Sequence, residues 1–122
     1  MATFEVVTAG IDITDLHGSI QIALANIPVS FADIESSYLG DPNLSRARLK
    51  PFTNLLNEIS RYCGAGRSRI DLVIFPEVSV PHAWESMLVA WARRHRIGVV
   101  CGLEHRVNAK GQALNEVLAA LP

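Results

Sequence analysis

Two short apolar runs, Asp71 to Phe75 (DLVIF) and Ile97 to Leu103 (IGVVCGL), most constrain the fold of this chain. Such runs are typical of strands that are buried on both faces. Between them, Pro81 to Arg96 predicts a helix, because one face carries a regularly spaced apolar stripe. Parallel strands cannot be joined by a tight turn, so the order strand, helix, strand implies a parallel pair and an α/β fold. The stripe consists of Trp84, Met87, Leu88, Trp91, Ala92 and His95.

Further elements precede this unit. Residues 4–9 (FEVVTA) predict a short strand, and residues 19–27 (SIQIALANI) a buried strand. Residues 51–63 (PFTNLLNEISRYC) predict a helix that Pro51 begins and Gly64 ends as a left-handed cap. The buried side chains of the second strand are expected to be Ile20, Ile22, Leu24 and Ile27.

The remaining segments are more polar. Residues 30–50 predict a loop with one short helix, which Asp41 would cap and Pro42 would begin. After the last apolar run, residues 108–111 (NAKG) predict a reverse turn, and residues 113–121 (ALNEVLAAL) a strand or a short helix. The chain is therefore expected to end in a hairpin beside the parallel strands.

Composition excludes several classes of function. The 122 residues, 49% of them hydrophobic, suffice for one core. Eleven Lys plus Arg balance twelve Asp plus Glu, so no global charge draws the chain to nucleic acid or to an anionic membrane. Neither Cys63 nor Cys101 belongs to a CxxC pair, and no apolar run approaches the ~20 residues of a membrane span. The first residues also lack the basic segment of a signal peptide, so we expect a soluble cytoplasmic protein with reduced cysteines. No metal site is expected.

Glu77 is the candidate for chemistry. It follows the first apolar run directly after Pro76, and ligands of open α/β sheets bind at the carboxyl ends of the strands. A partly desolvated carboxylate there can act as a general base when a nucleophile lies within reach. The alternative is a solvated glutamate that begins a loop, and spacing alone favours that alternative.

The segment DLVIFPE, residues 71–77, resembles the glutamate block of the nitrilase superfamily of carbon-nitrogen hydrolases. Residues 20–27 (IQIALANI) look like that family's opening strand, and residues 51–63 occupy the place of the helix that follows it. Residues 99–106 (VVCGLEHR), with Asn115 in ALNEVLAALP, are similar to two later segments of the family. The resemblance runs from about residue 19 to residue 122.

By this resemblance the fold is an alpha-beta-beta-alpha sandwich, incomplete here, with its first strands and two helices. Residues 1–18 would be an extension or linker, and residues 19–122 the amino-terminal portion of the domain. Glu77 would be the general base of a Glu-Lys-Cys triad that hydrolyses a non-peptide amide or nitrile without a cofactor. The family's lysine and cysteine come later than these residues, so neither is expected in this chain, and the chain alone should be inactive. Lys50, Lys110, Cys63 and Cys101 do not stand at the family's positions.

Glu104 and Asn115 are the supporting candidates from the same resemblance. Glu104 would either orient the lysine or simply end its strand, and Asn115 would support the site or flank a turn. Residues 78–84 depart from the family where its substrate pocket forms, and the polar insert 31–50 is long. The second hypothesis is therefore a catalytically silent module for assembly or ligand sensing in a larger protein.

The expected partners are a small amide or nitrile, and either further copies or further domains that cover the sheet. No nucleic acid or membrane contact is expected through this segment. A Cys101–His105 dyad is excluded, because four residues of strand separate them by about 13 Å. The basic residues Arg93, Arg94 and Arg96 are expected to complement the end of a helix rather than to bind phosphate.

Overall fold

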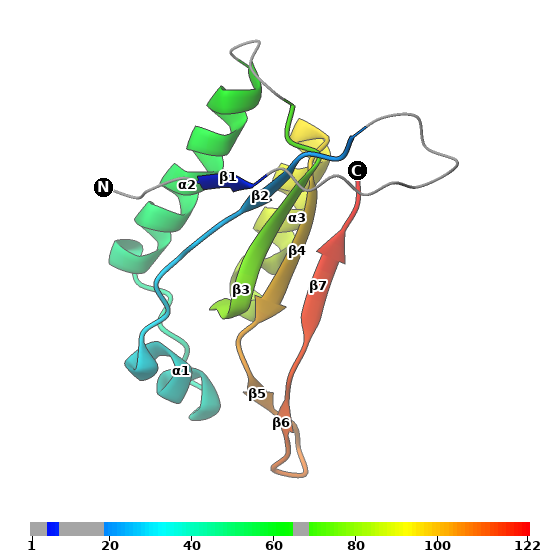
Figure 1. Ribbon diagram of the computed structural model, residues 1–122. Coiled ribbons are helices and arrows are strands. Elements are labelled where there is room, and N and C mark those ends of the chain that lie inside the picture. Colours follow the sequence, from blue (N-terminus) through cyan, green and yellow to red (C-terminus); the bar gives the residue numbers. More distant parts are fainter. Residues whose placement is uncertain (1–4, 8–18, 65–68) are drawn as a thin grey trace.

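Within residues 5–7, 19–64 and 69–122, which the computed structural model describes, the chain forms a five-stranded mixed sheet with a separate hairpin (Figure 1). The three central strands are parallel, and each edge strand runs antiparallel to its neighbour. The predicted α/β class is confirmed, as is the parallel pairing of the two apolar runs. The order across the sheet is β1 (Glu5–Val7), β2 (Ile22–Leu24), β3 (Leu72–Val80), β4 (Gly98–Leu103) and β7 (Val117–Ala120).

Two helices cover one face of this sheet. Helix α2 (Arg46–Gly64) connects β2 to β3 after a shorter helix, α1 (Phe31–Tyr38). A turn of 3-10 helix, η1 (His82–Trp84), leads into α3 (Glu85–His95), which connects β3 to β4. Both α2 and α3 share one core with alternate strand residues, so both lie on the same face. Its main members are Phe52, Leu56, Ile59, Val73, Phe75, Leu88, Ala92, Val99 and Cys101.

The opposite face of the sheet is apolar and uncovered in the portion of the chain that the structure describes. The strand residues between the core positions point to this side, because successive side chains alternate across a strand. Leu24 is 46% exposed and Val117 is 68% exposed. Ile22, Leu72, Ile74 and Val100 on the same face are half-buried. Within the described residues, helices therefore cover one face of the sheet and leave the other face open.

The orientation of the second strand corrects a prediction. The regular part of residues 19–27 is only Ile22–Leu24, and the core side chains are Ala23 and Ala25 rather than Ile22 and Leu24. Of the four predicted residues, Ile27 packs against this core. Ala23 pairs with Val73, whose side chain faces the helices. Ile22 and Leu24 therefore lie on the uncovered face.

Both helix starts also differ from expectation. Ser30 caps α1, its hydroxyl accepting a hydrogen bond from the Asp33 N–H, so the short helix precedes Asp41 and Pro42. Helix α2 begins at Arg46, and Pro51 lies inside it, where it cannot donate one of the helix's backbone hydrogen bonds. Two backbone donors of its first turn, Arg48 and Leu49, bond to the Ser45 carbonyl. In both places a serine directly before the helix, and not the predicted proline, marks where the helix begins.

The helix ends differ as well. Gly64 is the last residue of α2 and has no left-handed backbone, so the predicted glycine cap is wrong. The left-handed cap occurs instead at Arg96, with φ 55°, after α3. His95 is exposed, because the stripe of α3 leaves the core one turn before the helix ends, although its ring lies 5.2 Å from that of Trp91.

The carboxyl-terminal segment is extended rather than helical. The turn at residues 108–111 is confirmed: the Gly111 N–H donates to the Asn108 carbonyl, and Gly111 has φ 75°. It joins β5 (Arg106–Val107) to β6 (Ala113–Leu114). Asn115 and Glu116 then interrupt the strand before β7 pairs with β4, so residues 113–121 form two strands. None of the described helices combines the length and apolarity needed to cross a bilayer.

The uncovered face predicts self-association of the 122-residue chain, because apolar surface of this kind favours burial. Substituting Leu24→Lys puts a charge on that face and should shift sedimentation-velocity profiles toward the monomer. The matched control is Leu39→Lys, which changes a residue 78% exposed beside α1 and should leave association unchanged. A wild-type chain that stays monomeric at every concentration would contradict the prediction.

Candidate functional site

A large irregularity in β3 holds Glu77. Phe75 pairs with Cys101 and Val80 pairs with Leu103, so four residues of β3 lie opposite the single residue Gly102 of β4. The sequence predicts Glu77 just beyond the end of this strand, but it lies within the bulged part of β3 and is exposed. The strand continues past Pro76 because pairing resumes at Val80. A bulge of this kind re-aims side chains, and bulges occur often beside active sites.

The backbone of the bulge is strained. Val78 has φ 55°, a left-handed conformation that is rare for a β-branched residue. Gly102 makes the bulge possible, because a Cβ at this position would lie 2.6 Å from the Glu77 Cα and 2.8 Å from the Val78 nitrogen. Strained residues of this kind concentrate at functional sites. The close backbone approach therefore fixes where the Glu77 carboxylate can be.

Glu77 lies over the uncovered face of the sheet. Cys101 and Leu103, on either side of Gly102, are both buried among the helix-facing core. The missing side chain of Gly102 would therefore point to the other face, which is where the Glu77 backbone passes. The carboxylate thus belongs to the carboxyl edge of the parallel strands and to the side that the helices leave open.

Asn115 holds one oxygen of the Glu77 carboxylate. Its Nδ2 donates to Glu77 Oε1 at 3.1 Å, bridging 38 residues of sequence. The structure therefore brings together two of the three predicted site residues, from β3 and from the connection between β6 and β7. Glu77 is exposed, as the alternative of a solvated glutamate expects, but it lies in the bulge of β3 instead of beginning a loop.

Glu104, the third predicted site residue, is buried instead. It is 1% exposed, and both of its carboxylate oxygens are engaged: the Ser37 hydroxyl donates to Oε2 and the Arg48 guanidinium to Oε1. Its N–H donates to the Val80 carbonyl at 2.8 Å. Removing the charge of Arg48 would leave the Glu104 carboxylate buried without compensation. Glu104 therefore anchors α1 and α2 to the end of β4.

Arg48 is the residue of this region that sequence reasoning missed. Its guanidinium also contacts the Asn43 carbonyl at 3.1 Å and Asp33 Oδ2 at 3.5 Å, and lies 5.5 Å from the Trp84 ring centroid. Desolvation raises the pKa of Asp33, but hydrogen bonds from Asn43 and Ser30 and the charge of Arg48 outweigh it, so the pKa is lowered. The sequence indicated Arg48 only indirectly: Glu104 directly follows a buried strand, and a buried carboxylate is expected to pair with a cation.

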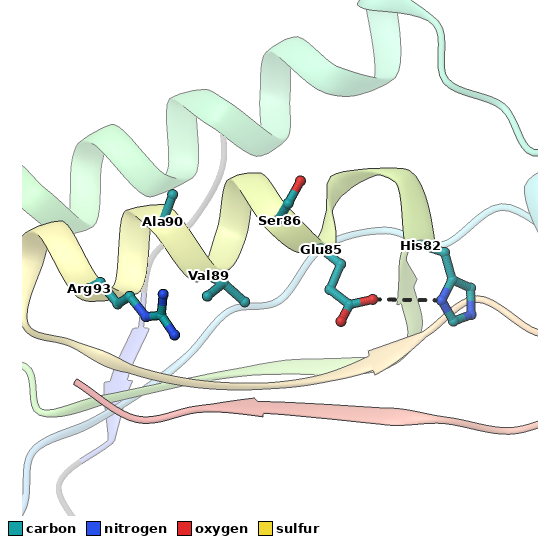
Figure 2. Close-up of a pocket in the computed structure, with 6 residues that line it drawn as sticks. All are labelled: His82, Glu85, Ser86, Val89, Ala90 and Arg93. Atoms are coloured by element: carbon teal, nitrogen blue, oxygen red, sulfur yellow. Dashed lines mark ion pairs between the residues drawn. The ribbon is translucent and has the colours of Figure 1, made fainter.

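A second ionic cluster lies on the helix side of the same edge. Arg106 donates two hydrogen bonds to Glu116, at 2.7 and 2.8 Å, which lower the pKa of Glu116 and raise that of Arg106. His82 Nε2 lies 3.3 Å from Glu116 Oε2, and His82 Nδ1 lies 3.9 Å from Glu85 Oε2. Figure 2 shows His82 and Glu85 at one end of a surface cavity of about 420 Å³ along α3, with Arg93 at the other end.

Neither cysteine of the chain is placed as a nucleophile. Cys101 is fully buried in β4, and burial, helped by the negative charge of Glu85, raises its pKa to about 11. Cys63 is half-buried near the end of α2. Lys110 is exposed in the hairpin turn, and Lys50 is exposed on α2. The described residues also contain no group of three or more His, Cys, Asp or Glu that could hold a metal ion.

Comparison with known proteins adds no relative. No family model matches the sequence, and neither a curated protein nor a solved structure matches the chain.

The close approach at Gly102 predicts a sharp sensitivity to a single methyl group. Gly102→Ala should lower the free energy of unfolding by roughly 1–3 kcal/mol in urea titration, because the added Cβ must displace backbone atoms of the bulge. Gly64→Ala is the matched control: its Cβ meets no atom within 4 Å. That variant should be unchanged or gain about 0.5–1 kcal/mol, as glycine weakens helices. Equal stabilities of the two variants would contradict the packing at Gly102.

The two thiols should differ in reactivity. At pH 8 Cys101 is inaccessible and remains protonated, since its pKa is about 11, whereas Cys63 is partly accessible. Titration of the native chain with a chromogenic disulfide should modify one thiol, and the second only after unfolding. Cys63→Ser should remove the native reaction entirely. A rapid reaction that persists in this variant would show that Cys101 is accessible.

Proposed function

We propose that this chain is the amino-terminal portion of a nitrilase-like carbon-nitrogen hydrolase, with Glu77 as the general base that serves hydrolysis of a non-peptide amide or nitrile. One observation carries the proposal: the Glu77 carboxylate is held by Asn115 on a strained bulge at the carboxyl edge of the parallel strands. The motif resemblance of residues 71–77 supports the same role. In this proposal a lysine and a cysteine from outside these 122 residues complete the triad.

The arrangement suits proton transfer. Asn115 binds Oε1, so Oε2 is the oxygen that would accept the proton of the cysteine thiol. The thiolate then attacks the amide carbon, and the lysine stabilises the negative charge on the substrate oxygen. When the carbon–nitrogen bond breaks, the amine leaves with the proton from Glu77. Glu77 next takes a proton from water, the resulting hydroxide cleaves the thioester, and the sulfur recovers that proton.

The uncovered face supports the finer proposal for the fold. In an alpha-beta-beta-alpha sandwich a second sheet packs on the face that the helices leave open. Here that face is apolar, with Leu24 and Val117 exposed, and Glu77 lies at its edge. A second sheet, contributed by later residues of the same domain or by another copy, would cover the face and bring residues close to the carboxylate.

The same face favours a second candidate function, a catalytically silent module for assembly. An exposed apolar sheet face is an interaction surface whether or not the neighbouring carboxylate is catalytic. The two candidates differ in their chemistry. Only the hydrolase requires a cysteine that forms a thioester with an amide substrate, which mass spectrometry of the complete protein would detect as an acyl adduct.

Substitution of Glu77 tests the leading proposal in the complete protein to which this chain belongs. Glu77→Gln keeps an oxygen for Asn115 to bind but cannot accept the thiol proton. Ammonia release from a panel of amides and nitriles should fall by about 10²–10⁴-fold. Glu58→Gln, at an exposed position of α2, is the matched control and should retain full activity. Turnover by the Glu77→Gln variant within a few-fold of wild type would remove Glu77 from this role.

A further inference from the structure

Two side-chain bridges join the same two segments across the end of β4. The first links Glu77, in the β3 bulge, to Asn115, at 3.1 Å. The second links His82, two residues after β3 ends, to Glu116, at 3.3 Å. Strand β4 lies between these segments in the sheet and bonds to both: the Leu103 N–H donates to the Glu116 carbonyl, and the Glu104 N–H donates to the Val80 carbonyl. The two bridges therefore form a pair of clasps around one strand end.

The clasps lie on opposite faces of the sheet. Glu77 passes over Gly102 on the uncovered face. Glu116 precedes Val117, which points to that same face, so its side chain points to the helix side, where it meets His82 of η1. Asn115 and Glu116 are adjacent in sequence. A displacement of the Glu116 carboxylate can therefore shift, through one peptide unit, the Asn115 amide that binds Glu77.

The helix-side clasp contains an imidazole, whose charge depends on whether the ring is protonated. His82 faces Glu85 from α3 at 3.9 Å and Glu116 at 3.3 Å, and Glu116 is itself bound by Arg106 from β5. Arg93, farther along α3, lines the same cavity (Figure 2). His82 Nε2 is buried but not aligned for a hydrogen bond to Glu116. A proton on this ring creates an ion pair with two carboxylates, and loss of the proton removes that attraction.

We propose that His82 is a positioning residue: in its protonated form it draws Glu116 toward η1 and thereby fixes the Asn115 amide against Glu77. Arg106 holds Glu116 from the other side by two hydrogen bonds, and a guanidinium stays charged, so the imidazole is the variable member of the clasp. The bridge from His82 to Glu116 is an ion pair when the ring is protonated and loses that attraction when the ring is neutral. That the fixed Asn115 amide serves catalysis rests on the proposed function; the coupling between the two clasps does not.

Nuclear magnetic resonance on the 122-residue chain tests this coupling directly. With selective ¹⁵N labelling of asparagine, the Asn115 side-chain NH₂ signals are followed from pH 5 to pH 8 and assigned from their loss in Asn115→Asp. We expect them to move with the same midpoint as the His82 ring signals. In His82→Gln the movement should disappear. The matched control is His95→Gln, an exposed histidine at the other end of α3, which should keep the full movement.

Two results would overturn the proposal: Asn115 signals that do not depend on pH in wild type, or the same dependence in His82→Gln. If His82→Gln does not fold, Glu116→Gln decides, because it removes the carboxylate and should abolish the movement while His82 still titrates. A merely structural contact would lower stability in these variants without changing the pH dependence of Asn115. The signals do not depend on hydrolysis, so failure of Glu77 as a base and failure of the clasp are separate outcomes.

Discussion

The missing side chain of Gly102 is the constraint on which the candidate site depends. Because no Cβ occupies the space above β4, four residues of β3 can bulge across it, and Val78 adopts a conformation that an unconstrained strand would avoid. Pairing resumes at Val80, so the strain is confined to the residues that carry Glu77. The surrounding packing keeps the bulge in place: Val78 and Val80 are buried, and the Ser79 hydroxyl donates to the Pro76 carbonyl at 2.6 Å.

The buried Glu104–Arg48 pair has a complementary role just beyond the end of β4. It ties the amino-terminal end of α2, the end of α1 and the end of β4 to one another, while the Arg48 guanidinium also lies over Trp84 of η1. The helices and the strand that meet at the carboxyl edge of the parallel strands are thereby fixed on the helix side. Glu77 and Asn115 remain exposed on the opposite side. The helix side of this edge is therefore held by buried contacts, and the other side is open to solvent.

Periodicity predicted the parallel pair and its crossover helix because hydrophobic spacing is a local signal. The turn residues Asn108 to Gly111 indicated the hairpin, since Gly111 provides the positive φ that the turn requires. Periodicity could not predict that Ala23 faces the helices, because which side of a strand is covered depends on distant α2 and β3. The same holds for the site. The motif marked Glu77, Glu104 and Asn115, but only the fold could separate the exposed pair from the buried ion pair.

The exposed β5–β6 hairpin leads into the candidate site, because Asn115 directly follows it. Its turn is closed by its own contacts: the Asn108 side chain accepts hydrogen bonds from the Lys110 and Gln112 N–H groups, and the Asn108 N–H bonds to the Gln112 carbonyl. Strand β6 ends at Leu114, immediately before Asn115, so the hairpin leads directly to the amide that binds Glu77. The contacts that close this exposed arm therefore also bear on the position of the Asn115 amide that holds the Glu77 carboxylate.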